Sequence, residues 1–228
     1  MMITTPSKGQ DAEVKIHAPP MLMDYVPRAN GYVVQPRHMS FEEFITWCDE
    51  DTLAEWVDGD VILMSAPSIL HQDVVAFLLT LLRIFAEMKQ LGRVFTSPIK
   101  VQLPKRPSGR QPDLVYISKA NDGRIRSNYI EGAPDLVIEV ASPETVDTDR
   151  GEKLYEYENA GVAEYWLIDP MHQKATFYQL EDGEFSQILK AHAGEYQSQV
   201  LPGLKLRVEW LWQLPPVTTI LREMGVLG

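Results

Sequence analysis

The chain has 228 residues, of which 45% are hydrophobic, and its formal net charge is −11. This composition supplies enough apolar side chains for a sizeable core, and the acidic balance argues against nucleic-acid binding through bulk charge alone. The single cysteine, Cys48, excludes a disulfide within the chain, which fits a reducing compartment such as the cytoplasm.

Residues 1–38 are rich in proline and polar side chains and show no hydrophobic period, which predicts a partly disordered N-terminal arm. This segment contains no apolar stretch of the signal-peptide type. The longest apolar run, at 74–86, is interrupted by Thr80 and Arg83 and is shorter than a bilayer-spanning helix. We therefore expect a cytoplasmic protein without a membrane partner, in which residues 39–228 form a single domain.

The first elements of this domain have clear local signals. The stretch SFEE at 40–43 is a capping box and predicts a helix. EWVDGDVILM predicts a β-hairpin with its turn at Asp58–Gly59. A long helix is expected over 68–89, and its middle is apolar on every side. Such a helix is either buried on more than one face or part of a dimer interface.

Strand-like runs dominate the rest of the chain. VFTSPIKVQL, QPDLVYIS and PDLVIEVA predict three strands, with a polar loop over 119–133 between the last two. A helix is expected over 149–160, ended by Gly161, and VAEYWLIDP follows as a strand. A second hairpin turns at Asp182–Gly183, and a short helix follows Pro216. This order predicts a mixed α/β domain with a central mixed sheet flanked by helices, extended by the N-terminal helix and β-hairpin.

Acidic residues stand in or beside the predicted strands, where a core normally excludes them. Residues four apart on a strand share a face, so Asp135 and Glu139 point to the same side as Val137. Asp135 lies near the strand start, where a carboxylate reaches solvent or caps a loop. Glu139 lies in the body of an apolar strand, where an unpaired charge costs several kcal/mol. It therefore needs a metal ion, a basic side chain or a proton.

Lys153 is the expected partner of Glu139, because a helix that follows a strand packs back over the sheet. Together with Asp113 in QPDLVYI, these groups would form a carboxylate site for a hard divalent cation, with a lysine near the nucleophile. Such a site suits metal-assisted hydrolysis of a phosphodiester, in which Lys153 orients the attacking water or helps to deprotonate it. The alternative is a structural salt bridge.

The chain resembles the restriction-endonuclease-like superfamily, which has the pattern P-D…(D/E)-x-K. Within it, the chain is similar to a large bacterial endonuclease family, numerous in cyanobacteria and long filed as a domain of unknown function. The resemblance covers about residues 40–210. It is carried by EWVDGDVILM, by His71 at the start of the long helix, and by QPDLVYIS, PDLVIEVASPET, DRGEKLYEYENAGVAEYWLIDP and LPGLKL. The combination is specific, although none of these pieces is specific alone.

The resemblance implies roles for individual residues. Asp113 would be a ligand of Mg²⁺ or Mn²⁺, and Glu139 would be the acidic residue of the second motif and the other metal ligand. The superfamily pattern has a lysine two residues after this acid, where the chain has Ala141. Lys153 in the following helix would take the place of that lysine.

Further residues are candidates for the border of the site. Glu55 and His71 match family positions, although a charge in a hairpin is commonly exposed and a histidine at a helix start is commonly a cap. Asp135 is a candidate as well, but Pro-Asp at a strand start is also ordinary turn chemistry. Basic residues in the loops around the QPDLVYIS strand either contact a phosphate backbone or are simply solvated. The predicted nucleic-acid-binding residues are Lys105, Arg106, Arg110, Arg124 and Arg126.

These observations predict a homodimeric, Mg²⁺- or Mn²⁺-dependent endonuclease that hydrolyses DNA. The alternative is a catalytically inactive nucleic-acid- or protein-binding module that retains the nuclease fold. The acidic net charge and the position of the lysine on the helix are the two arguments for this alternative. A third class is a glycoside hydrolase with Glu55 and Glu139 as its paired carboxylates. The sequence offers no cluster of aromatic residues that would line a sugar cleft.

Overall fold

The computed structural model describes residues 26–27, 33–36, 38–49, 52–143 and 145–227. The N-terminal arm predicted over 1–38 therefore lies largely outside the described residues. Within it, β1 (Val26–Pro27) and β2 (Val33–Pro36) pair with each other, and β2 continues the pairing to a strand of the domain.

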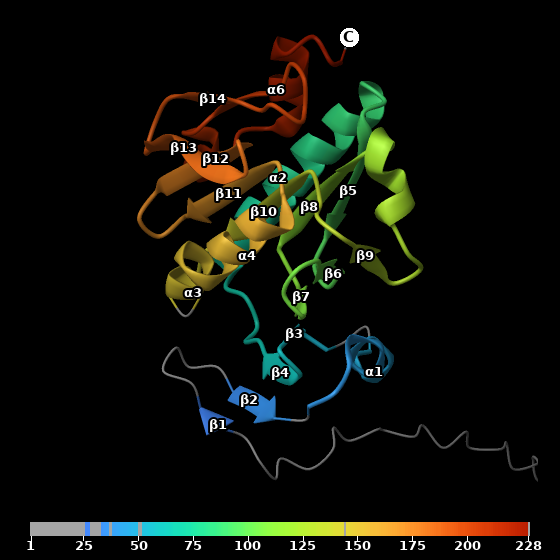
Figure 1. The fold of residues 1–228 in the computed structure, drawn as a ribbon. Helices are drawn as coiled ribbons and strands as arrows, with labels where there is room; N and C mark the ends of the chain where they lie inside the picture. The colour runs from blue at the N-terminus through green and yellow to red at the C-terminus, as the bar shows by residue number, and fades with distance from the viewer. Residues whose placement is uncertain (1–25, 28–32, 37, 50–51, 144, 228) are drawn as a thin grey trace, which may run out of the picture.

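The central sheet has six strands in the order β13-β12-β11-β10-β8-β5 (Figure 1). β10 (Leu136–Val140) lies parallel to β11 (Glu164–Asp169) and antiparallel to β8 (Leu114–Ser118), so the sheet is mixed. This confirms the predicted fold class. The remaining strands are β5 (Gly92–Thr96), β12 (Lys174–Glu181) and β13 (Glu184–Ala191), the last two joined by the expected turn at Asp182–Gly183.

A second sheet has seven strands in the order β1-β2-β4-β3-β7-β6-β9. The predicted first hairpin is confirmed as β3 (Ala54–Val57) and β4 (Asp60–Leu63), with positive φ angles at Asp58 and Gly59 as its tight turn requires. The hairpin is not a simple extension of the central sheet, because β3 also pairs with a strand from the middle of the chain. The other members are β6 (Lys100–Leu103), β7 (Ser108–Arg110) and β9 (Tyr129–Glu131).

Two sequence predictions are wrong in this region. The run VFTSPIKVQL is not one strand, because the chain leaves the central sheet at Ser97–Pro98 and β5 and β6 belong to different sheets. A proline cannot donate a hydrogen bond to a sheet ladder, which favours a break there. The stretch 119–133 is not only a loop. It contains a short 3₁₀ helix, η1 (Lys119–Arg124), and β9, which runs parallel to β6.

One face of the central sheet is covered by α2 (Ile69–Met88), whose N-cap is Ser68 (Figure 1). Its apolar side chains, including Leu78 and Leu82, belong to the same core cluster as Leu136, Ile138 and Val140 of β10. The C-terminal helices α5 (Trp210–Gln213) and α6 (Val217–Glu223) also contact α2, and the hairpin of β14 (Glu195–Gln197) and β15 (Lys205–Arg207) precedes them.

The packing of α2 changes two expectations. The helix has 20 residues and, by length and composition alone, is long and apolar enough to cross a membrane, so the argument that the apolar run is too short does not hold. However, 50% of its most apolar window is buried inside the protein, and a core helix passes the same test. Packing within one chain accounts for the buried half of this window, so the apolar run does not by itself indicate a dimer interface, and the homodimer stays a prediction.

The opposite face of β10 packs against α3 (Val146–Arg150) and α4 (Glu152–Ala160). One helix was predicted over 149–160, but the chain breaks at Gly151, whose backbone angles are not helical. α4 ends at Gly161 with a φ of 87°, as expected for a glycine C-cap. On this side Val137, Tyr157 and Tyr165 form a second apolar cluster, into which Glu139 projects. The first helix α1 (Phe41–Trp47) has the predicted capping box at Ser40.

Candidate active site

Lys153 on α4 is the centre of a buried group of charges at the junction of the two large sheets. Its Nζ atom lies 3.1 Å from Glu139 Oε1, 3.1 Å from Glu55 Oε1 and 3.2 Å from Asp149 Oδ1. All four side chains are at most 5% exposed. The predicted approach of Lys153 to Glu139 is therefore found, and two further carboxylates share the same amine.

Burial and charge act in opposite directions on these groups. Burial alone would lower the pKa of Lys153, but the carboxylates of Glu139, Glu55 and Asp149 raise this pKa well above its ordinary value. For Glu139, burial raises the pKa of the carboxyl well above its usual range, although Lys153 opposes the shift. Burial also raises the pKa of Asp149. The contact with Lys153 therefore does not offset the effect of burial on the pKa of Glu139 or of Asp149.

Glu55 on β3 has a lowered pKa, in contrast to Glu139 and Asp149. Burial would raise its pKa, but Lys153 and Arg110 lower it to about 2. Arg110 Nη1 donates a hydrogen bond to Glu55 Oε2 at 2.8 Å, and the backbone N–H of Gln111 donates to Oε1 at 3.2 Å. Glu55 therefore stays ionised and connects the lysine to an arginine in the second sheet.

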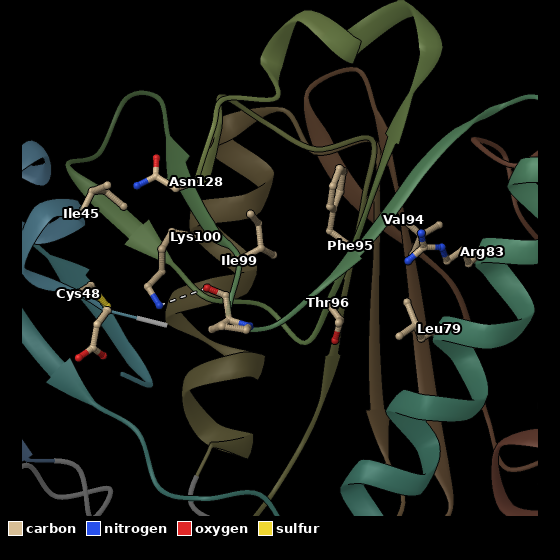
Figure 2. A pocket seen from close by; sticks show the side chains of 12 residues that line it. Ile45, Cys48, Leu79, Arg83, Val94, Phe95, Thr96, Ile99, Lys100 and Asn128 are labelled. Atoms are coloured by element: carbon tan, nitrogen blue, oxygen red, sulfur yellow. Dashed lines mark hydrogen bonds between the residues drawn. The ribbon is translucent and has the colours of Figure 1, made fainter. Parts of the chain in front are cut away.

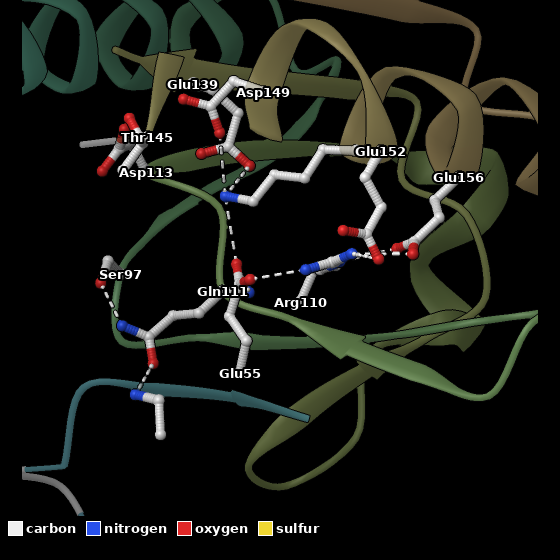
Figure 3. Close-up of polar contacts among 12 residues, drawn as sticks. Glu55, Ser97, Arg110, Gln111, Asp113, Glu139, Thr145, Asp149, Glu152 and Glu156 are labelled. Carbon is white, nitrogen blue, oxygen red and sulfur yellow. Dashed lines mark hydrogen bonds and ion pairs between the residues drawn. The ribbon is translucent and has the colours of Figure 1, made fainter. Parts of the chain in front are cut away.

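Arg110 on β7 is fully buried and joins Glu55 to two carboxylates of α4. It donates to both oxygens of Glu156 at 2.6 and 2.7 Å and lies 3.2 Å from Glu152 Oε1 (Figure 3). Glu156 also binds Arg106 at 2.7 Å. A bidentate arginine–carboxylate pair fixes both side chains in direction as well as distance. It therefore fixes α4, which carries Lys153, against the second sheet.

Asp113 lies just before β8, beside the last residue of β10. Its Oδ2 atom accepts a hydrogen bond from the backbone N–H of Val140 at 2.7 Å and lies 3.1 Å from His71 Nε2 on the first turn of α2. Because β8 and β10 are antiparallel neighbours, with Ile138 opposite Leu114, Asp113 is held at the same end of the sheet as Glu139. Both described contacts are made by Oδ2.

A pocket of about 620 Å³ brings the candidate residues together. Asp113, Glu139, Lys153 and His71 all line it, with Gln111 beside them. Its walls come from the segment before α2, the Ser97–Pro98 connection and the segment after β10. The site is thus assembled from both sheets and from the starts of two helices.

A second pocket of about 470 Å³ lies between α1 and the β5–β6 connection (Figure 2). Lys100 lines it and is 4% exposed. Its amine donates to the carbonyls of Thr52 and Pro98, both at 3.3 Å, and to the side chain of Gln111. All three N–H donors of Lys100 are engaged. One of them holds the side chain of Gln111, which lines the first pocket.

The site's carboxylates suit a magnesium-like ion, which is commonly held by one or two carboxylates together with water and substrate phosphate. Asp113 and Glu139 are two such groups in one pocket. Within the described part of the chain, no three His, Cys, Asp or Glu side chains form a ready-made metal site. The donor set therefore fits a metal that completes its shell with solvent and substrate.

Some predicted site residues lie elsewhere. Asp135 accepts hydrogen bonds from Ser118 and Asn121 before the first residue of β10, at the far end of the strand from Asp113, and does not line the pocket. Its contacts are those of a loop anchor. The prediction that Arg110 contacts nucleic acid is wrong, because its side chain is 0% exposed and bound by carboxylates.

The other predicted nucleic-acid-binding residues do not line the pocket either. Arg106 pairs with Asp58, Glu152 and Glu156, and Arg126 pairs with Glu131. Arg124 donates to the carbonyl of Ala133, and Lys105 is exposed. Their contact with a phosphate backbone stays a prediction.

Two residues of the site were missed in the sequence. Asp149 was not among the predicted site residues, yet it is 1% exposed and contacts Lys153. Tyr157, also buried, donates to Glu139 Oε1 at 2.7 Å. Both lie four residues from Lys153, one on each side. In the single helix that the sequence predicts over 149–160, this spacing would put all three on one face, and it was the signal that could have identified them. In the structure Asp149 lies on α3 and the other two lie on α4.

The chain is similar to proteins of one known family. A family model described as "Uma2: Putative restriction endonuclease" matches residues 41–209. This span coincides with the resemblance found in the sequence and confirms it. A search of curated proteins gave no match.

Among solved structures, the fold is similar to the crystal structure of "a putative nuclease belonging to DUF820" from Anabaena variabilis ATCC 29413. The TM-score is 0.66, the sequence identity is 18%, and the alignment covers 77% of this chain and 98% of the other. At this identity the likeness establishes the fold.

Proposed function

The chain belongs to the Uma2 family of putative restriction endonucleases, and from this premise we propose that it is a Mg²⁺- or Mn²⁺-dependent endonuclease that hydrolyses phosphodiester bonds in DNA. The observation that carries the proposal is the convergence of Asp113, Glu139 and Lys153 in one pocket. These residues come from different elements, and the side chains of Glu139 and Lys153 are 4% exposed.

Asp113 and Glu139 would hold the metal ion. When bound, a divalent ion neutralises phosphate charge and lowers the pKa of water, which generates a nucleophile near neutral pH. Asp113 is oriented by His71 and the Val140 N–H through Oδ2. Glu139 is held through Oε1 by both Lys153 and Tyr157. In each carboxylate the described hydrogen bonds gather on one oxygen, and the other is available as a ligand.

Lys153 would stabilise the negative charge that develops at the scissile phosphate, and it would orient Glu139, one of the two metal ligands, through their contact at 3.1 Å. Its raised pKa favours the charged amine, so in this arrangement it acts as a fixed cation rather than as a general base. Glu55 would keep the amine in place from the opposite side at 3.1 Å. The Glu55–Arg110–Glu156 contacts would position that carboxylate.

The test is titration of Mn²⁺ and Mg²⁺ into the wild type, Asp113→Ala and Glu139→Ala, followed by calorimetry, with plasmid nicking measured on the same samples. Metal binding and nicking should vanish together in both variants. Asp135→Asn is the matched control, because this carboxylate lies at the other end of β10, and it should retain both. Nicking that persists in EDTA, or a wild type that binds no metal, would overturn the proposal and leave Glu139 as a buried ion pair.

A non-cutting binding module is the second candidate. The observation that favours it is the engagement of Lys153 by three carboxylates, the arrangement that a purely structural ion cluster would also show. Metal binding without nicking of any DNA, with unchanged binding of DNA in Glu139→Gln, would support this alternative over catalysis.

A further inference from the structure

The candidate active site is recessed. The side chain of Asp113 is 17% exposed, and those of Glu139 and Lys153 are 4% exposed. A DNA duplex is stiff and costs energy to bend, whereas the backbone of an unpaired strand can enter a recess without bending a duplex. A scissile phosphate therefore reaches these carboxylates most easily on a strand whose nucleotides are unpaired.

The size and walls of the pocket suit one such nucleotide. Its volume of about 620 Å³ lies within the range of sites that enclose a small molecule. Apolar side chains, among them Leu53, Met64 and Val75, form part of the wall, and hydroxyl groups of Ser97 and Thr145 form another part. The first set can contact the faces of a base, and the Ser97 hydroxyl, which accepts a hydrogen bond from Gln111, can donate to the edge of the base or to the sugar.

The rim adds an exposed apolar side chain, because Met171 lines the pocket and is 62% exposed. A large apolar side chain in contact with solvent makes no favourable contact with phosphates. It gains contact area from the face of an unpaired base, as side chains that stack on bases do in proteins that bind single strands.

The charge around the pocket points the same way. The basic residues in its lining are Lys153 and His71, and both are paired with carboxylates. Arg110 is buried, and Arg124 and Arg126 lie outside the lining. Binding of an intact duplex depends largely on cations that follow its phosphate backbone. The described pocket lining offers no free cation for that purpose.

We propose that the site takes an unpaired nucleotide, so that the substrate is a single-stranded segment, an overhang or a flap and not an intact duplex. This inference rests on the proposed nuclease function. Met171 contacts a base next to the scissile phosphate, and the pocket encloses one nucleotide above Asp113 and Glu139.

The first test uses four labelled DNA substrates of the same sequence with Mn²⁺: a single strand, a blunt duplex, and duplexes with a 5′ or a 3′ single-stranded tail. The single strand and the tails should be cut at least about tenfold faster than the blunt duplex, because extrusion from a duplex costs unpairing energy. Equal or faster cutting of the blunt duplex would overturn this inference and leave the nuclease function intact. Cutting of none of the four would remove both.

The second test compares two exposed apolar residues. Met171→Glu should lower kcat/KM on the single strand about tenfold, the scale expected when one base loses its stacking partner. Ile188→Glu is the control, because Ile188 is 46% exposed on β13 and does not line the pocket, so the rate should be unchanged. Equal effects of the two substitutions, or no effect of either, would contradict the role assigned to the rim.

Discussion

The two faces of β10 are both buried, but they contact different kinds of side chain. On one face Leu136, Ile138 and Val140 pack against α2, and burial is accompanied only by apolar contact. On the other face Val137 is followed by Glu139, which is 3% exposed and needs Lys153 and Tyr157 as partners. The same five-residue strand therefore carries a face that stabilises the fold and a face that holds charge in a place where charge is costly.

The difference shows where the chain has a costly buried carboxylate at a position where an apolar side chain would serve stability better. An apolar side chain at 139 would fit between Val137 and Ala141, which both belong to the apolar cluster on this face. Replacement of buried ion pairs by apolar groups of similar size is often neutral or stabilising. A buried carboxylate with a raised pKa, next to a pocket, is instead typical of a functional site.

The largest effect is expected when the charged face loses one member. Arg110→Met leaves Glu55 and Glu156 buried without their shared cation and should lower the free energy of unfolding by about 4 kcal/mol. Urea denaturation followed by circular dichroism measures this. Arg126→Met is the control, because its pair with Glu131 is 46% and 49% exposed and is worth about 0–1 kcal/mol. Similar losses in both variants would show that burial does not distinguish the two pairs.

Acid pH should separate two carboxylates of the same cluster. The folded-state pKa of Glu55 is lowered from 4.5 to about 2, so its contribution of about 3 kcal/mol is present above pH 4.5 and is lost as the pH falls towards 2. Glu139 has a raised folded-state pKa, so its contribution is present below pH 4.5 and is lost as the pH rises through that raised value.

The free energy of unfolding of Glu55→Gln and Glu139→Gln, measured from pH 3 to 9, checks both signs. Glu55→Gln should flatten the acid side of the stability profile, and Glu139→Gln should flatten the decline on the alkaline side. If both substitutions flatten the same side, the assignment of opposite shifts is wrong.

A smaller effect is expected from Tyr157→Phe. The variant loses one hydrogen bond to the Glu139 carboxylate but keeps the contact with Lys153, and should lose about 1.5 kcal/mol of stability. Mn²⁺ affinity measured by calorimetry should fall as well, because Glu139 is then oriented by one partner alone. Tyr116→Phe removes a partly buried hydrogen bond to the Leu91 carbonyl, outside the pocket lining, and should leave Mn²⁺ affinity unchanged.

The smallest effect is expected on the apolar face. Ile138→Val removes one methylene group from the cluster around α2 and should cost about 1 kcal/mol. Metal affinity and cleavage rate at 25 °C should equal those of the wild type, because this side chain points away from Lys153. A change in either quantity would show that the two faces of β10 are coupled through the strand.

Local signals predicted the individual elements well. The capping box at Ser40, the Asp-Gly turns and the glycine at 161 act within a few residues, and each has the expected form in the structure. The contact between Glu139 and Lys153 was also accessible, because a strand and the helix that follows it are close in sequence. Their catalytic roles, and that of Asp113, stay predictions.

Long-range pairing was not accessible to the same reasoning. β7 has three residues, too few for a recognisable alternation, and Arg110 at its end was taken for a loop residue. Its partners Glu55 and Glu156 are 55 and 46 residues away in the chain. A sequence pattern cannot indicate which of two sheets a short strand joins, because both sheets offer similar edges. For this reason the second sheet and the burial of Arg110 both emerged only in the structure.

The path of the chain between the two sheets has a consequence for folding. The chain passes from one sheet to the other after β4, after β5, after β7, after β8 and after β9, so neither sheet can be completed before the other has begun. Topologies dominated by such non-local pairing fold slowly. Because strands of both sheets lie on either side of it, proteolytic or genetic division near residue 112 should give two fragments that are unfolded alone and recover structure only when mixed. The pocket, whose lining comes from both halves of the chain, should be absent from each fragment and return on mixing.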